Sequence, residues 1–188
     1  GDGDAADLVD VDFTATFAQY LWWFAADTSA GTLTPNQITT YAALKNGIDI
    51  AIGDIDDDGD EDIVVVGTLG QEIQWYSNSG DGSSWTRMNL NIDKDIVAPV
   101  TVYAADVDGD TDLDVVSASQ NDIKVVWYQN TDGAGTFAAA ATIETEFIDS
   151  TPAYTANGYY YEATETSVEI KAVSVFVADI DGDSKQDV

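Results

Sequence analysis

The sequence predicts an all-β protein built from short antiparallel strands, four to a blade, repeated along the chain in the manner of a β-propeller. Runs of β-branched and aromatic residues, such as Ile63–Val66, alternate with turns rich in Gly, Asn, Asp and Ser. Landmarks of these runs also recur every 52 residues. Such a period is the size expected of one four-stranded blade.

Three kinds of landmark share this period: an aromatic pair, a single large apolar residue and an acidic residue. They are Trp23-Phe24, Trp75-Tyr76 and Trp127-Tyr128; Leu33, Trp85 and Phe137; and Asp2, Asp54 and Asp106. We therefore divide the chain into repeats at 1–53, 54–105 and 106–178, followed by the start of a fourth at 179–188.

Each repeat is expected to place four strands around one acidic loop. The ranges are 47–52, 100–104 and 173–177 for the strand before the loop; 63–66 and 115–118 for the strand after it; 72–76 and 123–128 for the aromatic strand; and Trp85 or Phe137 as the start of the last. The array holds only about 3.6 repeats, fewer than a closed propeller has. We expect either part of a longer array or an open array whose edges pair with other subunits.

The third repeat contains an insertion of about 21 residues at 148–167, rich in Tyr, Thr and Ala. Two interpretations are open. The segment is a surface loop without fixed structure, or it binds a partner or bridges subunits, because Tyr-rich loops suit interfaces.

The composition excludes several classes of function. The 188 residues include 35 acidic and 6 basic residues, for a net charge of -29, so the chain repels nucleic acid and anionic membranes. The absence of Cys and His excludes disulfides, thiolate or imidazole catalysis and the usual zinc or copper sites. The longest apolar stretches span about ten residues, too few for a membrane span. We expect a protein that is not an enzyme.

The acidic residues are concentrated in four loops, and three of these share the pattern D-x-D-x-D-x-x-x-D. Alternate residues of a tight turn can direct carboxylates at one centre, and calcium takes six to eight oxygen ligands. Positions one, three, five and nine supply side chains: Asp54, Asp56, Asp58 and Asp62; Asp106, Asp108, Asp110 and Asp114; Asp179, Asp181, Asp183 and Asp187.

Position seven is expected to contribute its backbone carbonyl, at Asp60, Asp112 and Lys185. A fourth loop is degenerate, with Asp2, Asp4 and Asp10 but Ala6 at the fifth position, and weak or no binding is expected there. The sequence therefore predicts three calcium sites. The alternative is that the loops are solvated turns, which Asp and Gly also favour. An EF-hand is excluded because Val65 or Ser117 stands where that motif needs Glu.

The acidic loops and the segments that contain the aromatic pairs both carry a resemblance to a known family. The segments "DIDDDGDEDIVVV", "ADVDGDTDLDVVSAS" and "ADIDGDSKQDV" resemble the calcium loops of FG-GAP/VCBS-type repeats, and "IQWYSNSGDGSSW" and "VVWYQNTDGAGTF" resemble a second segment of such arrays. This resemblance implies a calcium-stabilised β-propeller, as in integrin α-subunits, at the cell surface or secreted, used for adhesion or as a scaffold.

Three functions follow as hypotheses. The first is a non-catalytic extracellular structural or adhesion module in which calcium fixes the loops. The second is a subunit of a surface filament or sheath, assembled through open β-edges. The third is an accessory domain of a polysaccharide-active enzyme that binds glycan through exposed aromatic rings. The expected partner is a protein or glycan of the cell surface, or another copy of the chain.

Overall fold

The computed structural model describes residues 8–12, 20–27, 29–38, 47–67, 72–88, 90, 96–120, 124–143, 150–151, 154–156, 159–161, 164–165, 175–180, 182 and 186. All regular elements in these ranges are β-strands, so the predicted all-β class is confirmed. Within the same ranges, no helix is long and apolar enough to cross a membrane.

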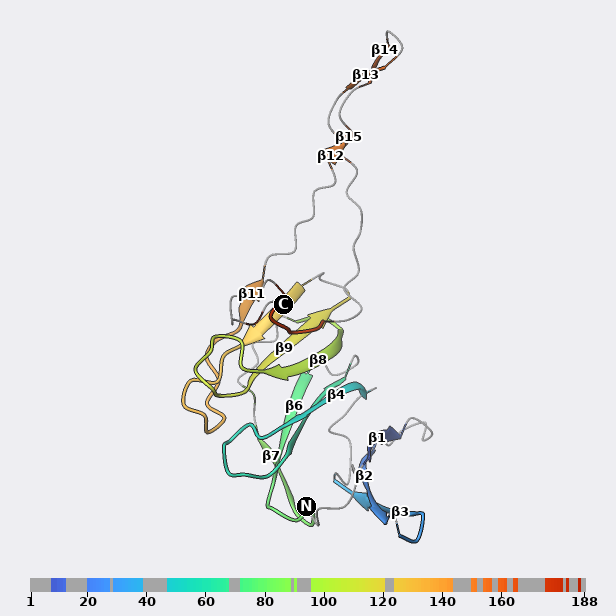
Figure 1. Cartoon of the computed structure of the whole chain (residues 1–188), viewed down its shortest axis with the longest axis vertical. Coiled ribbons are helices and arrows are strands. Elements are labelled where there is room, and N and C mark those ends of the chain that lie inside the picture. The colour runs from blue at the N-terminus through green and yellow to red at the C-terminus, as the bar shows by residue number, and fades with distance from the viewer. Residues whose placement is uncertain are drawn as a thin grey trace.

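Two four-stranded antiparallel sheets form the centre of the molecule (Figure 1). Each is a meander in which consecutive strands are neighbours. The first consists of β4 (Gly47–Gly53), β5 (Asp62–Gly67), β6 (Glu72–Asn78) and β7 (Trp85–Met88). The second consists of β8 (Pro99–Ala105), β9 (Asp114–Ser119), β10 (Lys124–Tyr128) and β11 (Ala141–Ile143). These strands lie close to the ranges expected from the 52-residue period.

The second strand of each sheet is the most deeply buried. All six residues of β5 and of β9 are buried, as expected of an inner strand covered on both faces. The two first strands also share an irregularity in register, between Gly47 and Asp49 in β4 and between Pro99 and Thr101 in β8. The first two strands of the two sheets therefore share the same irregularity.

The two sheets pack directly against each other. Asp49 Oδ2 in β4 accepts hydrogen bonds from Thr101 Oγ1 at 2.6 Å and Val102 N at 3.0 Å, both in β8. Trp75 is 1% exposed and meets the Phe137 ring edge-on, with centroids 6.1 Å apart. Two of the predicted repeat landmarks, Trp75 and Phe137, thus pack in the core between the neighbouring sheets.

The last strand of the second sheet begins later than predicted. Phe137 forms only an isolated bridge with Asn130, and β11 starts at Ala141, which pairs with Trp127. In the first sheet the equivalent strand does start at Trp85. The predicted strand start at Phe137 is wrong, because one additional residue before β11 breaks the ladder as a bulge does.

The first repeat forms a smaller sheet from β1 (Leu8–Asp12), β2 (Tyr20–Asp27) and β3 (Thr32–Gln37). Its first pairing departs from the common register. Val11 pairs with Leu21, whereas the equivalent pairing of Ile63 with Tyr76 would have joined Val11 to Phe24. The period therefore does not predict the register of this sheet.

The insertion at 148–167 contains short antiparallel pairs. β12 (Ser150–Thr151) pairs with β15 (Thr164–Glu165), and β13 (Tyr154–Ala156) pairs with β14 (Tyr159–Tyr161). Figure 1 shows these pairs extending away from the two central sheets. Of the strand predicted at 173–177, residues 175–177 are not in a strand and the others lie outside the described ranges.

Candidate metal centre

Two acidic loops, 54–62 and 106–114, connect the first and second strands of the two central sheets. In both, the first aspartate accepts hydrogen bonds from the backbone at positions five and six. The bonds are Asp58 N to Asp54 Oδ1 at 3.1 Å, Gly59 N to Asp54 Oδ2 at 2.9 Å, Asp110 N to Asp106 Oδ1 at 3.1 Å and Thr111 N to Asp106 Oδ2 at 3.0 Å. These bonds curl each loop around its first carboxylate.

The backbone has positive φ at two positions of each loop. Position four is Asp57 (55°) in the first and Gly109 (82°) in the second, and position six is Gly59 (95°) and Thr111 (84°). Gly182, at position four of the loop that begins at Asp179, has a φ of 81°. Gly59 and Gly109 adopt this conformation freely, whereas Asp57 and the β-branched Thr111 adopt it as non-glycine residues, at a cost that is larger for Thr111.

The ninth aspartate of the first loop is a buried hydrogen-bond acceptor. Asp62 is fully buried, and its Oδ2 accepts bonds from Ile55 N at 3.1 Å and Trp75 Nε1 at 3.2 Å, while Oδ1 accepts Asn78 N at 2.8 Å. Burial raises the pKa of Asp62 to about 6. The three hydrogen bonds lower this pKa and the charge of Asp56 raises it further, but burial has the largest effect. A negative charge at this buried position therefore requires a proton or a cation to compensate it.

Asp114 occupies the same position in the second loop and is also fully buried. It accepts Val107 N at 3.1 Å and Asn130 N at 2.8 Å. Trp127 Nε1 makes no hydrogen bond of good geometry within the described ranges, although Trp127 does lower the pKa of Asp114. Burial outweighs these contributions and raises that pKa above its ordinary value.

The third aspartate of the first loop has an oxygen that lacks a partner. Asp56 Oδ2 accepts Ser77 Oγ at 3.0 Å, but its Oδ1 is buried with no hydrogen-bond partner among the described residues. Burial raises the pKa of Asp56, and repulsion from Asp58 and Asp54 adds to the rise. Since a buried oxygen of this kind is costly, it is a position at which a cation would be stabilising.

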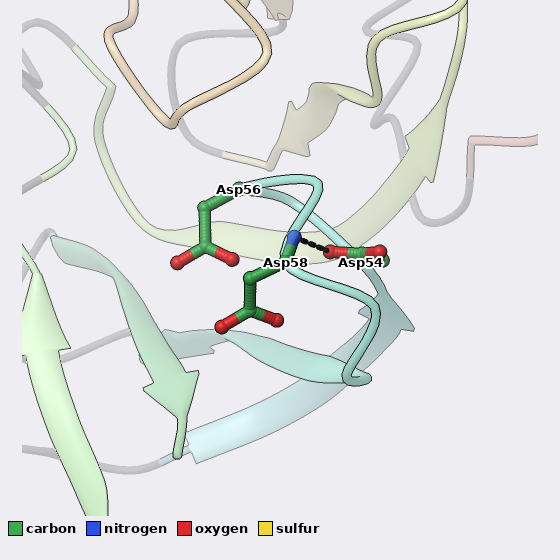
Figure 2. A group of neighbouring side chains, drawn as sticks. All are labelled: Asp54, Asp56 and Asp58. Atoms are coloured by element: carbon green, nitrogen blue, oxygen red, sulfur yellow. Dashed lines mark hydrogen bonds between the residues drawn. The ribbon is translucent and has the colours of Figure 1, made fainter. Parts of the chain in front are cut away.

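The structure gathers carboxylates in both loops. Oxygens of Asp54, Asp56 and Asp58 all lie within 4.8 Å of one another, and so do oxygens of Asp106, Asp108 and Asp114. Figure 2 shows the first group on a single turn, with the bond from Asp58 N to Asp54 dashed. All-carboxylate oxygen sets suit a hard divalent cation, and the flexible geometry of calcium more than the strict octahedron of magnesium. The residues present therefore fit the predicted ion.

The other predicted site residues are placed less completely. The side chain of Asp60 lies beside Gly80 and that of Asp112 beside Gly133, so their carbonyl role stays a prediction. Asp179 Oδ1 accepts Gly182 N at 2.7 Å, as Asp106 accepts Gly109 N. Asp10 lies in β1. The remaining predicted ligands fall outside the described ranges: Asp2, Asp4, Asp181, Asp183, Lys185 and Asp187.

Sequence reasoning missed the asparagines that hold the ninth aspartates. Asn78 and Asn130 each donate their backbone N–H to that carboxylate. They stand 52 residues apart, so the repeat itself contained the signal. The side-chain oxygens of both accept backbone N–H groups of the following turn, from Gly80 and Gly82 and from Gly135.

The family model described as "FG-GAP-like repeat" matches residues 54–117 and 106–157, which together span more than half of the chain. Both matches begin at the first aspartate of an acidic loop. No curated protein matches the sequence. A solved structure reported as "Structural basis of specific recognition of non-reducing terminal N-acetylglucosamine by an Agrocybe aegerita lection" is similar, with 20% identity and a TM-score of 0.46, over 74% of this chain and 38% of that one. The chain thus spans less than half of that lectin.

Proposed function

The chain belongs to the FG-GAP-like repeat family, and we propose that it is a non-catalytic, calcium-binding structural or adhesion module of an extracellular or cell-surface protein. One observation carries the proposal. Each of two successive sheets gathers three aspartates at the same turn, and one of them, Asp56, has a buried oxygen that lacks a hydrogen-bond partner in the described part of the chain.

Calcium would act on structure. The side chains that would bind it in the first loop are Asp54, Asp56, Asp58 and Asp62, which span the connection from β4 to β5. A bound ion would neutralise their mutual repulsion and restrain the turn that orders the first two strands. Stabilisation by a ligand of the folded state then follows from linkage.

An extracellular location is part of the proposal. Outside the cell, modules with dissociation constants of about 10⁻⁴–10⁻³ M suffice to hold calcium, and several of these carboxylates, such as Asp58 and Asp110, are exposed. The resemblance to cell-surface repeats points the same way. The absence of His and Cys from the whole chain supports a role without catalysis.

Thermal unfolding with excess EGTA or with millimolar calcium tests the proposal. We expect calcium to raise the melting temperature by roughly 5–10 °C if two sites are filled at about ten times their dissociation constants. The variant Asp58→Asn/Asp110→Asn should lose most of this gain, because it removes one ligand charge from each loop. The asparagine side chains keep an oxygen that can accept Asp60 N and Asp112 N, so the turns themselves should be retained.

Asp27→Asn is the matched control. Asp27 accepts Ser29 N and Ala30 N in an exposed turn outside the acidic loops, so removal of its charge should leave the calcium response intact. An unchanged melting temperature for the wild-type chain in calcium would contradict the proposed function.

A second candidate function, a subunit of an assembled surface structure, is favoured by exposed apolar side chains in the last described segment. Ile180 occupies the second loop position, as Ile55 does, but the Ile180 side chain is 77% exposed whereas that of Ile55 is 1% exposed. The Phe176 side chain is 65% exposed, although its ring contacts Tyr103. Sedimentation across a concentration series would test this. Self-association weakened by Ile180→Ser would support assembly, and a monomer at all concentrations would oppose it.

A further inference from the structure

One fully buried side chain, Asn130, connects the two acidic loops. It lies beyond the end of β10, and its side-chain Nδ2 donates to Ile55 O at 2.9 Å across the boundary between the sheets. Its backbone N donates to Asp114 Oδ1 at 2.8 Å within its own sheet. A single residue therefore touches the second position of one loop and the ninth position of the next.

The bond to Ile55 O acts next to a ligand of the first loop. That carbonyl belongs to the peptide group that joins Ile55 to Asp56, so its orientation influences where the Asp56 carboxylate points. Ile55 N is held in turn by Asp62 Oδ2 at 3.1 Å. Asp62 and Asn130 thus hold the N–H and the carbonyl of Ile55, the residue just before the third ligand position of the loop 54–62.

A second contact joins the same two loops. A Cβ on Gly53, the residue before Asp54, would lie 2.6 Å from Leu113 Cδ1, so the Leu113 side chain packs closely on the backbone there. The Leu113 carbonyl also accepts Asn130 Nδ2 at 3.3 Å. The segment before Asp114 and the segment that opens the first loop are therefore in contact through both apolar and polar groups.

Asn78, the equivalent residue of the first sheet, provides the comparison. Its backbone N donates to Asp62 Oδ1 at 2.8 Å, and its Nδ2 donates to Glu61 O at 3.2 Å. Those bonds correspond to the bonds of Asn130 with Asp114 and Leu113. Among the described residues, the Nδ2 of Asn130 donates one bond more than that of Asn78, the bond to Ile55 O, and this bond makes Asn130 a connection between sheets.

We propose that calcium binds the two loops cooperatively and that Asn130 is the positioning residue that couples them; this inference rests on the proposed function. An ion in either loop orders the groups that Asn130 contacts. When the second ion binds, its loop is already partly ordered, so binding loses less conformational entropy. Positive cooperativity results. The loops are also close enough for repulsion between Asp57 and Asp112, which an ion in either loop would relieve.

Calorimetric calcium titrations test the coupling, on the full chain with the loop at 179 silenced by Asp179→Asn. The calcium affinity of each loop is measured twice, once with the other loop intact and once with the other loop disabled. Asp56→Asn/Asp58→Asn disables the loop 54–62, and Asp108→Asn/Asp110→Asn disables the loop 106–114. About 0.5 M NaCl, where the Debye length is roughly 4 Å, suppresses the charge repulsion. We expect an intact second loop to tighten the first about fivefold or more.

The same titrations with Asn130→Ala should show less than about twofold tightening, whereas Asn78→Ala should lower affinity at the first loop but keep the coupling. If Asn130→Ala does not fold, nitrogen–proton NMR of the wild-type background gives the readout. The Asn130 side-chain amide should then shift when only the loop 54–62 can be filled. Persistence of the coupling in Asn130→Ala, or an unmoved Asn130 amide, would overturn the inference.

Independent binding at both loops in the wild-type background would also overturn it while leaving the proposed function intact. The complete absence of calcium binding would instead end both. The two failures are thus distinguishable in one set of titrations.

Discussion

The loops 54–62 and 106–114 have the same four aspartates at the same spacing, but they arrange them differently. Carboxylates one, three and five lie together in the first loop, and carboxylates one, three and nine in the second. The difference lies at the ninth residue. Asp62 accepts a hydrogen bond from Trp75 Nε1, whereas Trp127 Nε1, the equivalent group of the second sheet, makes no such bond of good geometry to Asp114. Identical ligand sets can therefore differ in how much of each carboxylate is already engaged by the protein.

Removal of the ninth carboxylate should produce the largest effect. Asp62→Ala leaves three donors, two of them buried, without an acceptor, and we expect it to reduce the free energy of unfolding by about 3 kcal/mol in EGTA. Asp114→Ala should cost about 1 kcal/mol less, because one hydrogen bond fewer is lost. Urea denaturation of both variants measures the difference. Equal costs would show that the Trp75 bond does not distinguish the two loops.

The pH dependence should be next in size. The pKa of Asp62 is about 6 in the folded chain and 3.8 ordinarily, so between these values the folded chain holds a proton that the unfolded chain releases. Without calcium, stability should therefore rise by roughly 2–3 kcal/mol as pH falls from about 6 to about 4, and be lost again as pH rises through 6.

Melts in EGTA across this pH range measure the slope, and Asp62→Asn separates the contribution of Asp62 from that of the large negative net charge. The substitution should flatten the slope markedly. The same slope in both proteins would contradict the assignment to Asp62. The gain from calcium should show the opposite trend and decline below pH 6, because protons then compete with the ion for Asp62.

Glycine placement should give the smallest effects and the clearest contrast between loops. Thr111 is β-branched with a φ of 84°, where the first loop has Gly59. Thr111→Gly should therefore stabilise the chain by about 1 kcal/mol, and Gly59→Ala should destabilise it by a similar amount. Asp57→Gly should change little, because Asp tolerates the left-handed region. Urea midpoints that move in the other direction would show that these loops carry no such strain.

The sequence predicted most of the central sheets because their strands are apolar runs between Asp- and Gly-rich turns. β5, for example, was expected at 63–66 and spans Asp62–Gly67. The start of β11 could not be predicted, because the additional residue after Phe137 changes the register without a change in the pattern. The register of β1 with β2 was not predictable either, because Val11 pairs with Leu21, three residues before the Phe24 that the period indicates.

The candidate site was only partly predictable. Spacing identified the aspartates, since a loop of fixed length brings alternate side chains together. It did not reveal that Asp62 and Asp114 are buried acceptors, because their donors, such as Asn78 and Asn130, come from a strand end far along the chain. Nor did it indicate the bond from Asn130 to Ile55 O, which depends on how one sheet packs on the next.

Counting bound calcium ions by native mass spectrometry tests the central claim most directly. We expect the wild-type chain to retain at least two ions, Asp58→Asn and Asp110→Asn each to retain one fewer, and Asp27→Asn to retain the wild-type number. Retention of no calcium by the wild-type chain, or of an unchanged number by both loop variants, would contradict the account of these loops as calcium sites.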